Sequence, residues 1–557
     1  MFSNKQTKLF DAKKTSNTPV TSTFVQAGLK KSAKTLSSNG SEKFSSSGDD
    51  FVDQFSNLGV YKAPRKFSDI EKDCELLWSQ NQLLSVIFLF YIRMITRVTN
   101  LFNGSVTSTA QKGGELKHEG IFRMIWLAIK APSTFKKNLP LFISIGSWKD
   151  VFTILSYDLQ YNGWENRKLD WKYFGNLLLS GLKDPKQSEL IKKYLPQIKS
   201  NSRCTTLESQ ADNLIAKWVC SLLFGSKESS YNYKQYRKLK SSGTAHEWQK
   251  LISQRRFDKI DFNKIHGRAL KLLSRSKFLK NQGLEKVYEE WITKPETQDV
   301  KYTGYVHELF SKLPGSLSGL SKGQQETINK QFDTLVAKGG ETEGKTSLIV
   351  VRDTSGSMTS QATGTTMSSD TIAKALALYF SAFLKGNFKD AWIEFNDETT
   401  MHTWKGSTVL ERWYNDRTES YGSTNFQGVI DLFVQLKRQG IPESEFPTGI
   451  LCISDGEFNP SQLGKTNVDS ARIKLQNAGF SKEYCDNFVI ILWDIPNRYY
   501  SSDSKPKFET FGATKNVFYM SGYSAAQVSF LMSGTIETAK DLFLTAMNQE
   551  ALGLIEL

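Results

Sequence analysis

The chain has 557 residues and a mass of 63.1 kDa, with 39% apolar and 23% charged residues. At roughly 150 residues per domain, this length predicts two to four domains rather than one core. No run of about 18 apolar residues is present, which argues against a membrane-spanning helix, and the opening MFSNKQTK lacks the apolar region of a signal peptide. We therefore expect a cytoplasmic protein, in the host cytoplasm or the virion if the chain is viral.

Cysteine and histidine usage argues against disulfides and zinc. The five cysteines include no CxxC pair, and none of the five histidines has the i, i+4 spacing of a zinc-binding helix. A disulfide framework or a zinc site is therefore not expected.

The net charge of +15 is distributed unevenly along the chain. Residues 61–340 contain 45 basic and 26 acidic residues, a net charge of +19, whereas residues 341–557 contain 19 basic and 26 acidic residues, a net charge of −7. A basic excess of this size indicates a polyanionic partner such as RNA for the first part. The alternative is that the excess serves solubility only.

Residues 1–50 are rich in Ser, Thr, Lys and Asn and end in SSNGSEKFSSSGDD. Such a segment cannot bury enough apolar surface to offset the entropy lost on ordering, so it predicts a disordered tail. In residues 51–340, apolar residues recur at spacings of three and four, as in IEKDCELLWSQNQLLSVIFLFYIRMITRV. This spacing predicts helices, and the turn signals between them favour a basic domain of stacked helical hairpins.

Residues 341–557 show a different pattern, because short apolar runs alternate with amphipathic helices. The alternation predicts an α/β doubly wound domain, with a mostly parallel sheet and helices on both faces. The expected strands are Ser347–Val351, Ala391–Phe395, Ile450–Ile453, Phe488–Trp493 and Val517–Met520, and the expected helices cover 371–386, 424–440 and 524–534.

Oxygen-bearing side chains follow three of these segments. The first strand ends in DTSGSM, the segment GSTNFQG precedes a helix, and ILCISDGEF ends a buried strand. Ligands of such folds bind beyond the carboxyl ends of the strands, and carboxylate and hydroxyl oxygens suit Mg²⁺, Mn²⁺ or Ca²⁺. We predict a divalent metal site, with Mg²⁺ as the first choice, formed by Asp353, Ser355, Ser357, Thr424 and Asp455. The alternative is a capped strand end that binds no metal.

Nothing in this pattern indicates catalysis. Ser355 occupies the position at which a phosphoryl-transfer motif would need a second aspartate, and no Walker-type phosphate loop is present. No histidine or cysteine adjoins Ser355 or Ser357 in sequence to activate a nucleophile. We therefore predict a binding site and a protein that is not an enzyme.

The spacing of these residues resembles the metal-ion-dependent adhesion site of von Willebrand factor A domains. The resemblance implies that Ser355, Ser357 and Thr424 contact the ion, and that Asp353 and Asp455 act mainly through bound waters. It also implies one open coordination position for an acidic residue of a protein partner. Arg352, directly before Asp353, is unusual in an otherwise apolar strand.

The order of a basic helical region and an A domain resembles the TROVE family of telomerase, Ro and vault proteins. The segments LFYIRMITR, FKKNLPLFISIGSWKDVF and KLLSRSKFLK are similar to segments of that family. The resemblance implies HEAT-like repeats arranged as a ring, with single-stranded RNA ends in the hole and structured RNA outside. An uncharacterised branch of related proteins, some from large viruses and phages, has the same domain order.

Clustered cations supply a physical case for RNA binding, since they make salt-dependent phosphate contacts. Arg93 and Arg97 have the spacing that places them on one helix face, and Trp148 either stacks on a base or lies in the core. The segment YNYKQYRKLK mixes aromatics with cations, as a single-strand binder or a surface helix would. The RNA-binding candidates are Arg93, Arg97, Lys136, Lys137, Lys149, Lys271, Arg275 and Lys277; the alternative for each cluster is a solvated helix face.

Two functions therefore remain open. The first is a monomeric, non-enzymatic ribonucleoprotein component, which binds RNA with residues 51–340 and recruits a protein through the metal of residues 341–557. The second is a viral or cellular structural protein that docks partners through the metal site and binds no RNA.

Overall fold

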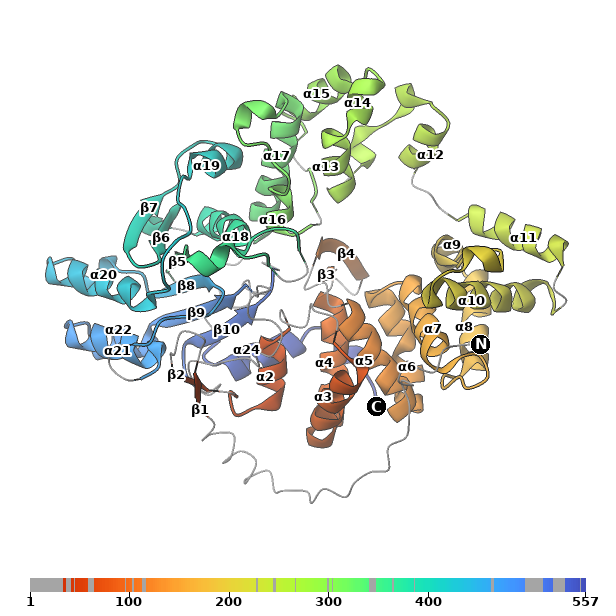
Figure 1. Cartoon of the computed structure of the whole chain (residues 1–557), viewed down its shortest axis with the longest axis horizontal. Helices are drawn as coiled ribbons and strands as arrows, with labels where there is room; N and C mark the ends of the chain where they lie inside the picture. Colours follow the sequence, from red (N-terminus) through yellow and green to blue (C-terminus); the bar gives the residue numbers. More distant parts are fainter. Residues whose placement is uncertain are drawn as a thin grey trace.

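The computed structural model contains a helical region followed by an α/β domain, as the sequence predicts (Figure 1). It describes residues 34–557 except 37–41, 45, 59–64, 96, 103–104, 113–116, 227–228, 244–246, 266, 298–299, 303, 340–346, 363–364, 385, 462–464, 496–513, 524–535 and 551. Most of the predicted tail, 1–50, and the predicted helix 524–534 lie outside the described residues. Within residues 34–50 the chain forms two short paired strands, β1 (Lys34–Leu36) and β2 (Glu42–Phe44).

The helical region is built from short helices, several of which begin with a capping side chain. Asp184 accepts from the Lys186 amide before a Pro at the first helical position, and Thr206 accepts from the Ser209 amide. The helices are α2 (Asp50–Ser56), α3 (Phe67–Gln80), α4 (Gln82–Ile95), α5 (Lys117–Lys130), α6 (Pro132–Ile145), α7 (Trp148–Asn162), α8 (Trp171–Lys183), α9 (Pro185–Tyr194), α10 (Leu207–Phe224), α11 (Ser230–Ser241), α12 (Glu247–Ser253), α13 (Gly267–Arg275), α14 (Lys277–Asn281), α15 (Glu285–Thr293), α16 (Val306–Leu309) and α17 (Lys322–Gly339).

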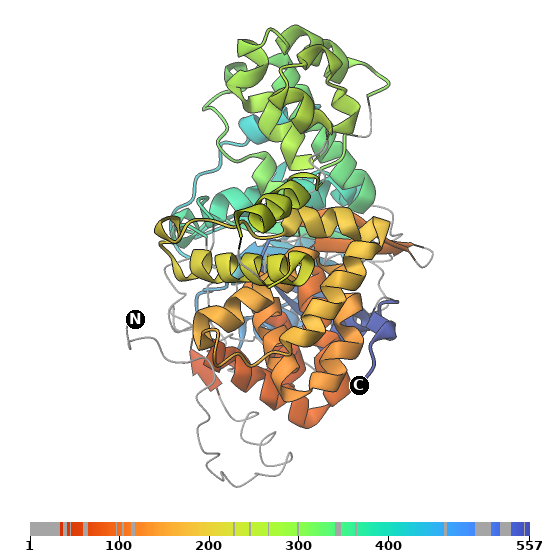
Figure 2. The same cartoon turned by 90° about the vertical axis from the view of Figure 1, so that its right-hand side faces the viewer.

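The helical region does not have a single core. Helices α3 to α10 share a large apolar core, whereas Phe262, Leu270 and Ile292 belong to a smaller, separate cluster around α13–α15. Figure 2 shows the segment from α12 to α15 standing apart from the earlier helices. A hairpin of β3 (Arg97–Phe102) and β4 (Ser105–Lys112) follows α4 directly.

The α/β domain contains a six-stranded sheet in the order β10-β9-β8-β5-β6-β7, in which only β7 is antiparallel to its neighbour. All five predicted strands are present, and the edge strand β7 was not predicted. The strands are β5 (Leu348–Asp353), β6 (Ala391–Phe395), β7 (Thr399–Thr403), β8 (Gly449–Ser454), β9 (Val489–Asp494) and β10 (Val517–Ser521). The helices are α18 (Ser369–Phe383), α19 (Val409–Asn415), α20 (Phe426–Arg438), α21 (Asn467–Asn477), α22 (Lys482–Asn487) and α24 (Ala539–Met547).

Alternate residues of the strands enter two different cores, which confirms the doubly wound architecture. Leu348 and Val350 of β5 belong to the core that also contains α18, whereas Ile349 and Val351 pack with α20 and α21 on the other face. The core on the α18 face continues without interruption into the helical region. The α/β domain is thus joined to the helices by an apolar interface.

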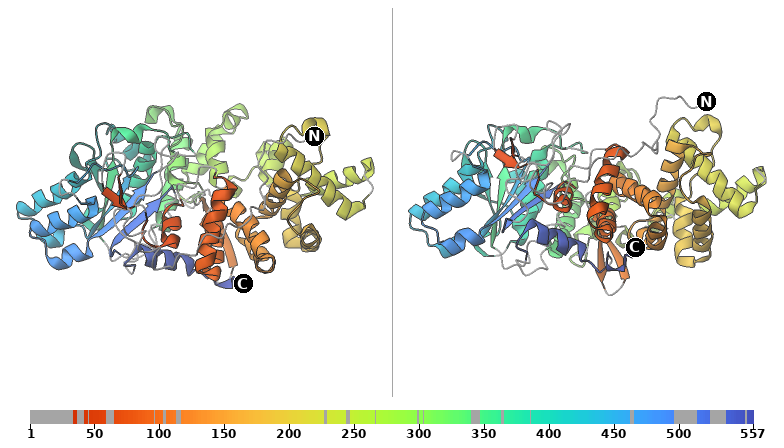
Figure 3. Two further views of the ribbon diagram at one scale, coloured as in Figure 1. Left: turned by 60° about the horizontal axis from the view of Figure 1, so that its bottom comes forward. Right: turned by 90° about the horizontal axis from the view of Figure 1, so that it is seen from below.

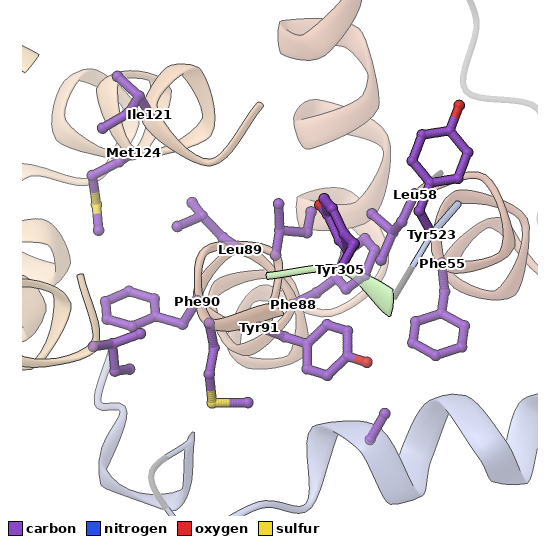
Figure 4. Packing of buried hydrophobic residues seen from close by; sticks show 14 of the residues in the cluster. Phe55, Leu58, Phe88, Leu89, Phe90, Tyr91, Ile121, Met124, Tyr305 and Tyr523 are labelled. Atoms are coloured by element: carbon purple, nitrogen blue, oxygen red, sulfur yellow. The ribbon is translucent and has the colours of Figure 1, made fainter. Parts of the chain in front are cut away.

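That interface centres on α4, whose Phe88 and Tyr91 lie among side chains from distant segments (Figure 4). Phe55 of α2 contacts Tyr91, with ring centroids 5.7 Å apart, and also contacts Phe543 of α24, with ring centroids 5.6 Å apart. Seen from below, α24 lies between the sheet and the helices (Figure 3). The chain end continues onto α6, where Asn138 exchanges two hydrogen bonds with the Glu556 backbone. The C-terminal part of the α/β domain is therefore joined to α2, α4 and α6.

Among the described residues, no helix is long and apolar enough to cross a membrane. The five cysteines are all buried and free, in agreement with the prediction that no disulfide framework exists.

Candidate metal centre

Three neighbouring parallel strands end at one edge of the sheet, and each brings an aspartate there. Asp353 is the last residue of β5, Asp455 follows β8, and Asp494 is the last residue of β9. The register pairs Ser454 with Asp494, so these three strand ends lie level with one another. Asp494 was missed from sequence because the predicted strand stopped one residue earlier.

The predicted ligands of the first loop are held by a chain of hydrogen bonds. One oxygen of the buried Asp353 accepts from the Ser355 amide at 2.8 Å, and its other oxygen accepts from the Ser454 hydroxyl. The Ser355 and Ser357 hydroxyl oxygens lie 3.1 Å apart, and Ser357 in turn hydrogen bonds to Asp455. Four of the five predicted ligands are thus linked directly, as the sequence predicts.

Thr424, the fifth predicted ligand, is buried on the loop before α20. This loop is hydrogen bonded to the loop after β5 and to the loop after β8. The Gly356 amide donates to the Gly422 carbonyl at 3.1 Å, and the Tyr421 amide donates to the Thr354 carbonyl at 2.9 Å. The Thr424 carbonyl accepts from the Asn459 amide at 2.9 Å. The three loops therefore form one bonded unit, in which Thr424 has little freedom to move.

The carboxylates at this edge are short of positive charge. Burial and the nearby charge of Asp455 raise the pKa of Asp353 to about 7. Burial likewise raises the pKa of Asp455, and burial together with Asp455 raises the pKa of Asp494 to about 8. A divalent cation would relieve this repulsion, and the hydroxyl and carboxylate oxygens present are hard donors of the type that Mg²⁺ prefers. The residues therefore fit the predicted metal. Among the described residues, no three His, Cys, Asp or Glu side chains form a metal-binding group, so the site depends on its hydroxyls.

Arg352 does not point into this site, because successive side chains of a strand face opposite sides of the sheet. Its guanidinium is buried and donates to Asp370 at 2.6 Å and to Asp416 at 2.7 Å. Asp370 lies in the first turn of α18, whose N-cap is Ser368. Asp416 lies on the loop that leads to Thr424. Arg352 therefore links the first turn of α18 to the loop that leads to Thr424, and two carboxylates neutralise its charge.

A lysine from the N-terminal segment reaches the acidic edge. Lys43 of β2 is buried, its ammonium donates to the Gly456 carbonyl, and it lies 5.3 Å from the centroid of the Phe458 ring. Its charge opposes the rise in the pKa of Asp455 and of Asp494. The sequence had placed Lys43 in the disordered tail, and no local pattern marked it as part of a site.

The predicted RNA-binding residues separate into two groups. Arg93 is buried, with a 2.5 Å ion pair to Asp150, and α4 ends at Ile95, so Arg97 in β3 does not share a helix with it. The prediction that these arginines form one helix face is therefore wrong. Lys271 is buried and donates to the Ser311 hydroxyl, and Arg275 donates to the Ser311 and Leu309 carbonyls. The amphipathic helix α13 directs these two cations inward, where they donate hydrogen bonds to the segment that contains Leu309 and Ser311.

The second group lies at the surface. Lys149 and Lys277 are exposed, Lys136 pairs with Asp170 at 2.6 Å, and Lys137 donates to the Leu557 carbonyl. Trp148 is buried in the core and cannot stack on a base.

The motif residues of the GSWKD segment have packing roles. A Cβ on Gly146 would lie 2.3 Å from an Asp150 oxygen, so glycine lets this carboxylate approach. Asp150 caps α7 by accepting from the Ser147 amide, and it holds Arg93. Two of the three segments that carry the family resemblance thus meet through one buried ion pair.

Comparisons with known proteins cover the two parts unequally. A family model described as a domain of unknown function (DUF7788) matches residues 347–552, which correspond to the α/β domain. No curated protein matches the chain. Among solved structures, the crystal structure of the Deinococcus radiodurans RO (RSR) protein is similar over 84% of this chain and 93% of that chain, at 11% sequence identity and a TM-score of 0.34. A TM-score of this size does not establish a common fold.

Proposed function

We propose that the protein is a non-enzymatic ribonucleoprotein component. Its basic helical region binds single-stranded or structured RNA, and its α/β domain, of von Willebrand factor A type, recruits a protein partner through a divalent cation, most readily Mg²⁺. The linked oxygen atoms at the ends of β5 and β8 support the metal-dependent half. The net charge of +19 over residues 61–340 supports the RNA half.

In the proposed site, Ser355, Ser357 and Thr424 bind the ion, while Asp353 and Asp455 hold its water ligands. The ion supplies a coordination position that an acidic side chain of the partner can fill. Each aspartate is already bonded to a hydroxyl, Asp353 to Ser454 and Asp455 to Ser357. Carboxylates held in this way are fixed in orientation, which suits them to hold the water ligands of an ion.

One observation favours the alternative, a docking protein that binds no RNA. Arg93, Lys271 and Arg275 are held by internal partners, so fewer of the predicted cations are available to phosphates. The exposed cations of α9 and α11 favour RNA binding, because the two helices contact each other and their cations are available to phosphates.

RNA binding can be tested directly with the full chain. A labelled single-stranded RNA and a hairpin with a free 3′ tail are titrated with protein at low and at physiological salt, with and without EDTA. We expect binding that weakens with salt and survives EDTA, because the cations bind phosphates without the metal. Absence of binding to either RNA at low salt would refute the RNA half and leave metal-dependent docking, which is tested by capture of partners with Mg²⁺ against EDTA.

A further inference from the structure

A basic groove lies between α9, the connection after it, α11 and α12. It has a volume of about 620 Å³ and is lined by Lys193, Gln197, Ile198, Tyr236, Arg237, Lys240, Ser241, Gly243 and Gln249. The lining contains three cations and no acidic residue. A groove of this volume falls within the range of ligand sites.

The floor of the groove is rigid. Tyr236 is fully buried and its hydroxyl donates to the Pro196 carbonyl at 2.9 Å, which fixes α11 against the segment after α9. Gly243 touches the end of α9 so closely that a Cβ there would lie 2.5 Å from the Lys193 amide nitrogen. Arg237, Lys240 and Ser241 are spaced three and four residues apart, so they share the face of α11 that borders the groove. The groove is therefore formed before any ligand arrives.

The cations of the groove are not committed to carboxylates. Arg237 and Lys193 are exposed, and neither forms an ion pair within the part of the chain that the structure describes. Lys193 lies 5.5 Å from the ring of Tyr194, and the Lys240 ammonium donates to the Leu195 carbonyl. Cations held at a groove without acidic partners attract anions, because bringing a phosphate there breaks no existing ion pair.

We infer that this groove binds the sugar-phosphate backbone of single-stranded RNA; the inference rests on the proposed RNA binding and names the place where it occurs. The three cations contact phosphates, and Gln197, Ser241 and Gln249 offer hydrogen bonds to ribose or base edges. Ile198 adds apolar surface for a base face. A concave site of this size suits a single strand, since a duplex presents a stiff, convex surface.

The test compares two charge reversals of equal size. Lys193→Glu with Arg237→Glu alters the groove, and Lys286→Glu with Lys322→Glu alters two exposed lysines elsewhere in the helical region. For a 12-nucleotide single-stranded RNA, we expect the groove pair to weaken binding at least about tenfold and the control pair less than about threefold. The slope of log affinity against log salt should fall by about 1.4 for the two lost phosphate contacts.

A third variant acts in the opposite direction, so that misfolding cannot mimic its effect. Gln249→Lys adds a cation to the α12 wall of the groove and should raise RNA affinity severalfold. Equal losses for the groove and control pairs, or no gain from Gln249→Lys, would overturn the groove as the site while leaving RNA binding in place. Wild-type protein that binds no RNA would instead refute the proposed function; binding of polyglutamate that the groove pair abolishes would then assign the groove to acidic protein segments.

Discussion

Replacement of Arg352 by Met should loosen the α/β domain together with the loops of the proposed metal site. Arg352 holds Asp370 and Asp416, and Lys374 adds a second cation 3.2 Å from Asp416. Burial would raise the pKa of Asp416, but the charges of Arg352 and Lys374 and a hydrogen bond from Thr418 hold that pKa at about 2, below its ordinary 3.8. The difference corresponds to about 2 kcal/mol of stability.

The loss in the variant should be somewhat larger, at about 3 to 5 kcal/mol, because removing one partner leaves a buried carboxylate partly uncompensated. Hydrogen exchange of the β5 amides at pH 7 measures the loss locally, and about 3 kcal/mol makes exchange about 100-fold faster. Arg438→Met, at an exposed position of α20, is the matched control and should change exchange less than twofold. Faster exchange by less than fivefold in Arg352→Met would refute a stabilising role of the ion pairs.

The pH dependence of this effect has a defined sign. The pKa of Asp416 is lowered in the folded protein, so its contribution is present above pH 3.8 and is lost as the pH falls toward about 2. The difference in thermal stability between wild type and Arg352→Met should therefore shrink between pH 4 and pH 2. A difference that stays constant over this window would show that Asp416 is not the group involved.

Three further predictions concern the site and the helical core. Asp353→Ala should abolish Mg²⁺-dependent capture of a protein partner and leave RNA affinity within about twofold; loss of RNA binding by the folded variant would show that the two parts are not separate. Lys43→Met should tighten Mn²⁺ binding, measured by calorimetry, by on the order of tenfold, because it removes a positive charge from the acidic edge; unchanged affinity would exclude competition between Lys43 and the ion. Gly181→Ala should lower the melting temperature, since its Cβ would lie 2.7 Å from Ile191 and 2.8 Å from Trp148, and overpacking costs about 1 to 3 kcal/mol; an unchanged melting temperature would mean that the helix preference for Ala offsets the crowding.

The sequence predicted the sheet well because buried parallel strands are continuous apolar runs. Each of the five expected strands agrees with the structure to within two residues at either end. The missed strand β7, Thr399–Thr403, lies at the edge of the sheet, and its side chains are mostly exposed or half-buried, so it carries no such run. Hydrophobic periodicity therefore identifies the interior of this sheet and not its boundary.

Whether an individual cation is held by an internal partner or stays exposed could not be predicted in the same way. Arg93 is neutralised by Asp150, 57 positions away, and Arg275 donates to carbonyls more than 30 positions further along the chain. Nothing in the local sequence distinguishes these residues from Lys149 or Lys277, which remain exposed. The grouping of Asp353, Ser355, Ser357 and Asp455 was predictable because these residues follow strands, and strand topology brings them to one edge.

The charges at this edge also explain why docking there should require a metal. Burial raises the pKa of Asp353 to about 7 and that of Asp494 to about 8, so without a cation these carboxyls largely hold their protons at neutral pH. Lys43 supplies one positive charge, and it is already committed to the Gly456 carbonyl. A divalent cation would displace these protons and supply the positive charge that a carboxylate of a partner requires. RNA should avoid this edge because residues 341–557 carry a net charge of −7, which places the two proposed ligands on different parts of the molecule and lets each bind without displacing the other.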